Sequence, residues 1–124
     1  MQFKLSKTHR YWWPVKVRMP SPDVAGEFVE MELRLQFEPM PRDEALAEQD
    51  QLSRNSQVRD MAVHEEAQFI RVIKNWDDVI DDDGEIVPFS PDKLRIALQQ
   101  SWFRASVSKA LAESMHGEAA RLGN

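Results

Sequence analysis

The sequence contains no cysteine, and this absence removes several kinds of chemistry at once. Without thiols there is no disulfide framework, no thiolate zinc site and no cysteine nucleophile. The four glycines are too few for a loop that cradles a phosphate. No apolar run approaches the roughly 20 residues that a membrane span needs, and no apolar core follows the charged N-terminus as it would in a signal peptide. We therefore expect a cytoplasmic protein with no cofactor and no membrane partner.

The residues that are present are those of an ordinary folded domain. The chain has 124 residues, of which 42% are apolar and 30% charged, and six Phe and four Trp supply large apolar surface. A chain of this length can bury roughly two-thirds of its unfolded surface and can fold alone. We predict a single domain over residues 1–124.

Charge is unevenly distributed along the chain, although the net charge is only −5. Residues 1–18 contain five bases and no acid, whereas residues 75–87 contain six acids and no base. The overall negative charge repels nucleic acid, and five dispersed Lys and Arg residues make only a weak binding surface for phosphates. We therefore expect no nucleic-acid partner. The basic and acidic segments are instead expected to face each other, within the fold or between copies of the chain.

Two segments alternate between apolar and polar residues with the period of a β-strand. Every second residue is apolar from Val29 to Glu38, and again from Val15 to Met19. This period places the apolar side chains on one face, and the turn formers from Pro20 to Gly26 connect the two strands. We predict an antiparallel hairpin with bases of the first strand opposite acids of the second. Phe3 and Leu5 suggest a third short strand.

After Pro39 the apolar residues change to helical spacing. A helix is predicted to open with residues 43–48, followed by a break between Asp50 and Ser56 where the pattern is lost. The next helix is predicted from seven apolar residues at steps of three and four: Val58, Met61, Ala62, Phe69, Val72, Ile73 and Trp76. We expect Trp76, the last of them, to be structural rather than a binding residue.

The acidic segment contains a turn signal, Asp82-Asp83-Gly84, between two short β-like pairs at 79–80 and 86–87. It fails as a calcium loop: with Gly84 at the sixth position, a valine and a serine occupy the first and twelfth positions, where ligands are essential. We predict a solvated turn or small hairpin and no metal site.

Two further helices are predicted at the C-terminal end. Ser90 is placed to cap the first, with Pro91 in its first turn, and Ser101 to cap the second, which Gly117 ends. The predicted fold is therefore α+β, with an N-terminal antiparallel β-hairpin packed against C-terminal α-helices. Its parts are a hairpin region (1–39), a helical region (40–76), an acidic turn (77–89), C-terminal helices (90–117) and a frayed tail (118–124).

No arrangement of residues predicts catalysis. The three histidines have no ligand spacing, and His64-Glu65-Glu66 lacks the second histidine of a zincin, because position 68 is Gln. The serines lie in no nucleophile elbow, and nothing indicates a desolvated carboxylate. We expect a protein that binds a partner, not an enzyme.

Two sets of residues are candidates for partner binding. Trp12 and Trp13 are neighbours on a predicted strand and must point to opposite faces, so one can enter the core. The other faces solvent or a partner, where Trp is favoured as an anchor, or lies flat on the outer face against Arg or Lys stems. The alternative surface is the acidic turn, represented by Asp77, Asp78, Asp82 and Asp83.

Six short motifs follow one another in a telling order: Tyr11-Trp12-Trp13-Pro14-Val15, Gly26-Glu27-Phe28, Phe37-Glu38-Pro39, Asn75-Trp76-Asp77-Asp78-Val79, Asp82-Asp83-Gly84 and Pro88-Phe89-Ser90. Over nearly the whole chain this order resembles the phage tail assembly chaperones of long-tailed phages and prophages. The most specific part is the central tryptophan, the acidic turn and the Pro-Phe-Ser helix start.

The resemblance implies a small protein of the host cytoplasm that binds the tape measure protein and keeps it soluble. It also implies that tail tube protein assembles around this client, and that the chaperone is absent from the finished virion. The six methionines would suit an adaptable client surface. The alternative is a structural tail or head–tail joining protein, whose self-association would give a fixed ring.

Overall fold

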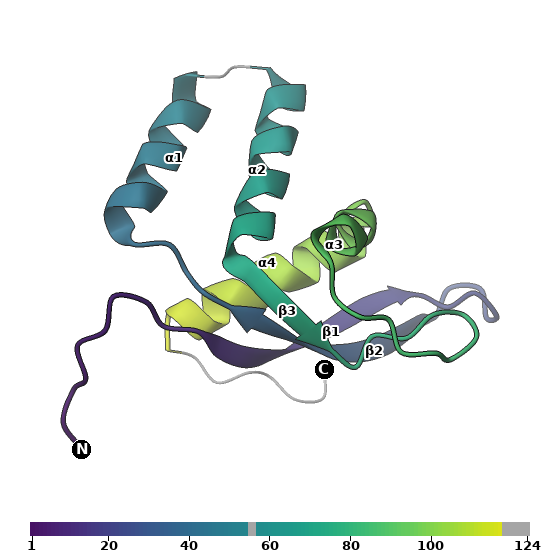
Figure 1. Cartoon of the computed structure of the whole chain (residues 1–124). Coiled ribbons are helices and arrows are strands. Elements are labelled where there is room, and N and C mark those ends of the chain that lie inside the picture. Colours follow the sequence, from purple (N-terminus) through teal and green to yellow (C-terminus); the bar gives the residue numbers. More distant parts are fainter. Residues whose placement is uncertain (55–56, 118–124) are drawn as a thin grey trace.

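The computed structural model, which describes residues 1–54 and 57–117, contains three strands and four helices (Figure 1). The sheet is antiparallel with strand order β1-β2-β3. In chain order the elements are β1 (Tyr11–Pro20), β2 (Phe28–Phe37), α1 (Arg42–Arg54), α2 (Val58–Val72), β3 (Ile73–Asp77), α3 (Pro91–Leu98) and α4 (Ser101–Met115). The predicted α+β fold, with a hairpin packed against helices, is confirmed.

The β1–β2 hairpin has the predicted strands and the predicted facing. Val15 pairs with Leu33 on the inner face, while Lys16 pairs with Glu32 and Arg18 with Glu30 on the outer face. The inner face joins one apolar core with the buried residues of α2, α3 and α4. The hairpin extends beyond the helices at its turn end (Figure 1), so the inner face is buried along only part of its length.

The third strand is not the predicted one. In the described part of the chain, residues 1–10 form no strand, and Phe3 and Leu5 are exposed. The third strand is β3, whose Trp76 pairs with Leu35 and whose Ile73 pairs with Phe37 across a register shift. The helical region predicted to reach residue 76 therefore ends at Val72, because pairing with β2 replaces the helix where the chain meets the sheet.

Helix α1 is longer than predicted and continues through Arg54, so the expected break is wrong for residues 50–54; residues 55–56 lie outside the described part. Within this polar stretch Arg54 bonds Asp50 at 3.1 Å, one turn earlier in the helix, a contact that adds only about 0.3–0.5 kcal/mol. None of the α1 residues, all of which are described, is buried. A helix that buries no residue needs no apolar stripe, so the loss of apolar periodicity after Asp50 did not indicate the end of the helix.

The caps of the last two helices match the prediction in part. Ser90 is the N-cap of α3, and its side chain accepts a hydrogen bond from the Lys93 N–H at 3.1 Å. Ser101 is not a cap, because α4 begins at Ser101 itself and Gln100 precedes it without a side-chain capping bond. Gly117 has φ +73°, the left-handed conformation that ends helices, as predicted. The predicted frayed tail, 118–124, lies outside the described residues.

Candidate partner-binding surfaces

Trp12 and Trp13 lie on opposite faces of β1, and the structure decides which one enters the core. Trp13 is partly buried against the apolar core and stacks edge-on against Tyr11, with the ring centroids 6.3 Å apart. Trp12 points away from the core and is 45% exposed. Of the two candidates, Trp12 is therefore the one available to a partner, and Trp13 is a packing residue.

Trp12 lies on the outer face of the sheet, in a row with Gln36 and Asn75. The next row on that face contains Pro14, Arg34 and Asp77. The core-forming residues of the described helices all pack against the opposite face. The register thus brings two of the predicted binding residues, Trp12 and Asp77, to the same open face, although they are far apart in sequence.

Asp77 and Asp78 are engaged by Arg34 rather than left free. The Arg34 guanidinium bonds the Asp77 carboxylate, and its Nε lies 3.6 Å from Asp78 Oδ2. Asp78 has φ +64°, the left-handed conformation in which the chain leaves the sheet after β3. These two carboxylates are therefore already paired with a side chain of β2, at the end of β3.

Asp82 and Asp83 lie at the exposed tip of the loop between β3 and α3, outside the sheet that carries Trp12. Asp81, a residue that sequence reasoning missed, shapes this tip: its Oδ1 accepts hydrogen bonds from the N–H groups of Asp83 and Glu85 at 2.9 and 3.0 Å. Such bonding is a known property of aspartate in turns and could have been anticipated. The small hairpin itself is confirmed by an antiparallel bridge between residues 80 and 86.

Trp76 fixes this loop to the body of the protein. Its ring is buried, its Nε1–H donates a hydrogen bond to the Val87 carbonyl at 2.8 Å, and it stacks edge-on against Phe89 at 5.3 Å. The expectation that Trp76 is structural is confirmed, although it performs this role from a strand and not from a helix.

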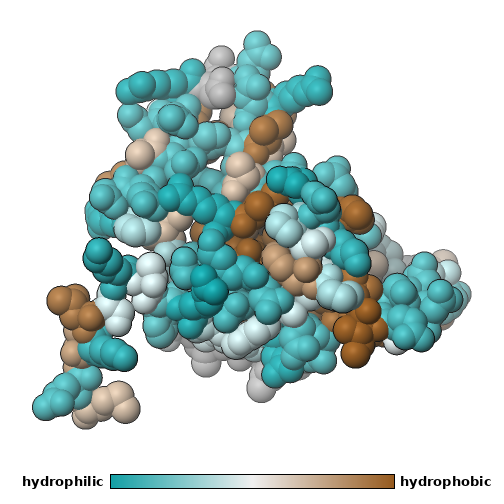
Figure 2. Space-filling model, viewed as in Figure 1, coloured by the Kyte–Doolittle hydropathy of each residue, from teal (hydrophilic) through white to brown (hydrophobic). Residues whose placement is uncertain are grey.

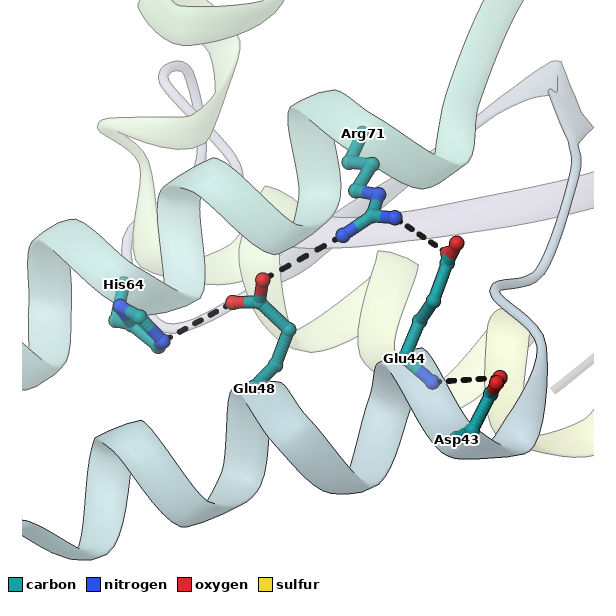
Figure 3. A network of polar contacts seen from close by, with 5 residues as sticks. All are labelled: Asp43, Glu44, Glu48, His64 and Arg71. Atoms are coloured by element: carbon teal, nitrogen blue, oxygen red, sulfur yellow. Dashed lines mark hydrogen bonds and ion pairs between the residues drawn. The ribbon is translucent and has the colours of Figure 1, made fainter.

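A further surface, which the sequence did not reveal, is the pair of helices α1 and α2 that projects from the sheet (Figure 1). Polar contacts join the two helices, as Figure 3 shows. Arg71 of α2 bonds Glu44 and lies 3.4 Å from Glu48, and His64 Nε2 lies 3.1 Å from the other oxygen of Glu48. Glu44 and Glu48 are one turn apart on α1, so they lie on the same face of the helix. This spacing is the sequence feature from which a shared contact could have been predicted.

The projecting pair leaves apolar side chains in solvent. Leu46 on α1 and Val58, Met61 and Val63 on α2 are exposed, whereas only Phe69 and Val72, at the sheet end of α2, are buried. Ion pairs between exposed side chains contribute little to stability, about 0–1 kcal/mol each. The outer part of this helix pair is therefore weakly held and offers uncovered apolar surface.

Within residues 1–54 and 57–117, no three His, Asp or Glu side chains lie close enough together to hold a metal ion. None of the helices in these ranges is long and apolar enough to cross a membrane. No family model, curated protein or solved structure matches this chain. The surfaces must therefore be interpreted from their own chemistry.

Proposed function

We propose that this chain is a tail assembly chaperone of a long-tailed phage or prophage. In this proposal it binds the tape measure protein in the host cytoplasm, keeps it soluble and promotes assembly of tail tube protein around it. The order of the sequence motifs supports this role. The structural observation that carries it is the α1–α2 pair, which exposes apolar side chains and is joined by ion pairs.

A tape measure protein is a long, helix-rich chain with apolar stripes, and such helices bind in apolar grooves or on apolar faces. The exposed Val58 and Met61, three residues apart and therefore on the same side of α2, provide apolar side chains for such a contact. Because no residue of α1 is buried, the helix can move to admit a client helix without unpacking the core. Trp12, on the outer face of the sheet, is a second apolar contact for the same client.

The test is co-expression with the tape measure protein of the same gene cluster, followed by measurement of its soluble fraction and by pull-down. Val58→Ser combined with Met61→Ser should reduce the recovered client several-fold, and Trp12→Ala should reduce it further. Ile96→Ser on α3 is the matched control, because Ile96 is also an exposed apolar residue but lies outside both surfaces. Retention of wild-type client levels in all variants would contradict the proposal.

Measurement of client binding at low and high salt distinguishes the remaining candidate sites and roles. Apolar contacts survive moderate salt, whereas contacts between exposed charges weaken as salt screens them. If client binding is lost at high salt and the three apolar substitutions have no effect, the client site is the acidic turn with Asp82 and Asp83. A ring of fixed size that persists at high salt and binds no tape measure protein would instead favour a structural tail or head–tail joining role.

A further inference from the structure

The first ten residues form an extended arm that makes almost no contact with the rest of the chain (Figure 1). Phe3 and Leu5 are 89% and 90% exposed, and Figure 2 shows apolar side chains in this segment, clear of the body of the protein. The single ion pair that ties the arm down is between Arg10 and Glu38, at 3.1 Å, among the described residues. Lys4 and Lys7 have no ion-pair partner in the described part of the chain.

The loop between β3 and α3, residues 78–90, has the complementary character. Ile80 and Ile86 pair across this loop and are both exposed. Around them lie Asp81, Asp82, Asp83 and Glu85, none of which forms an ion pair with another described residue. The loop thus presents apolar side chains surrounded by negative charge, while the arm presents apolar side chains interspersed with positive charge.

These two segments do not meet within one molecule. The arm leaves the sheet at Tyr11, which pairs with Phe37, and Phe37 pairs with Ile73 at the start of β3. The loop leaves after Asp77, at the other end of β3. Figure 1 shows the arm extending from the opposite side of the molecule to the loop.

We propose that the chain self-associates, with the N-terminal arm of one copy bound to the 78–90 loop of a second copy. Phe3 and Leu5 cover the exposed Ile80 and Ile86, which removes apolar surface of both copies from water. Lys4 and Lys7 lie among the loop carboxylates, and these charges select the arm over other apolar segments. This contact needs no client, so it stands independently of the proposed chaperone function.

The first measurement is the molar mass of the purified protein in solution, by sedimentation equilibrium over roughly a hundredfold range of concentration at low salt. The protein should carry no N-terminal tag, because the arm must be native. The expected result is a mass that rises with concentration above that of one chain and falls toward it as salt is added, because salt screens exposed charges.

Two charge reversals test the pairing itself. Lys4→Glu with Lys7→Glu makes the arm acidic, and Asp82→Lys with Asp83→Lys cancels the net negative charge of residues 81–85. The backbone N–H of Asp83 still donates to Asp81 after its own side chain is changed, so the loop shape is retained. Each double variant alone should associate about tenfold more weakly than wild type or worse, because the charge attraction between arm and loop is removed or reversed. An equimolar mixture of the two should regain association.

The control is Arg59→Glu with Lys109→Glu, which changes the charge by the same amount at exposed positions on α2 and α4 and should associate like wild type. Three results would overturn the proposal. One is a strictly monomeric wild type at low salt. Another is association that the reversals weaken no more than the control does. The last is carbodiimide cross-linking of Lys4 or Lys7 to the loop within one chain in a mixture of isotope-labelled and unlabelled protein.

Discussion

Leu33 and Met31 share the inner face of β2 and are two residues apart, but they differ in burial. Leu33 is 7% exposed and lies in the core, whereas Met31 is 55% exposed although Val17, its partner on β1, is buried. The alternation of apolar and polar residues predicts that both side chains face inward, but it does not predict which of the two is buried. Facing follows from local periodicity, but burial depends on how far the covering helices reach.

This difference predicts opposite outcomes for the same substitution. Leu33→Asp should unfold the domain, because an unpaired charge in the core costs more than the small margin by which domains are stable. Met31→Asp should change the free energy of unfolding by less than about 1 kcal/mol, because its side chain reaches solvent. Urea titration followed by circular dichroism measures both. A Leu33→Asp variant that melts like wild type would show that β2 faces the other way.

At the scale of elements, the hairpin and helix α3 could be predicted because their signals are local: strict alternation for the strands, and Ser90 before Pro91 for the helix start. The end of α2 could not be predicted from local signals. Val72, Ile73 and Trp76 fit helical spacing, and only pairing with Leu35 and Phe37, distant in sequence, makes this stretch a strand. Tertiary pairing overrode the local pattern.

The attachment of α1 gives a prediction at this scale. Arg71 contacts both Glu44 and Glu48, so Arg71→Ala removes most of the polar connection between the two helices. We expect amide hydrogen exchange in residues 42–54 to become faster, while the free energy of global unfolding changes by less than about 1 kcal/mol.

Arg54→Ala is the matched control for this experiment, because Arg54 pairs only with Asp50 of its own helix among the described residues. It should leave the contact between α1 and α2 intact. Unchanged exchange in α1 after Arg71→Ala would mean that contacts other than these ion pairs hold the helix in place.

For the whole molecule, the separation of arm and body predicts that the body folds without the arm. A chain starting at Arg10 retains the Arg10–Glu38 ion pair and every core residue. Its free energy of unfolding should stay within about 0.5 kcal/mol of wild type, because Phe3 and Leu5 bury nothing in a single copy. Thermal melting of dilute protein in high salt makes this comparison without self-association. A clear loss of stability would show that the arm packs on its own body.

Some features of the candidate surfaces follow from the local sequence, and others depend on contacts between segments that are distant in sequence. Sequence reasoning could state that Trp12 and Trp13 face opposite ways, but the choice between them required the position of the helices. It could also state that the basic and acidic segments are complementary. That they lie apart in one molecule depends on the third strand, which places the loop at the end of β3 remote from the arm.

The sheet ends on one side at β1, a ten-residue strand whose outer edge has no neighbouring strand among the described residues. Exposed edges of this length are templates for uncontrolled strand addition and fibrous aggregation. Pro14 and Pro20 lie in this strand, and a proline in an edge strand has no N–H to offer to an incoming chain. The two prolines therefore protect the β1 edge from joining a second sheet edge to edge.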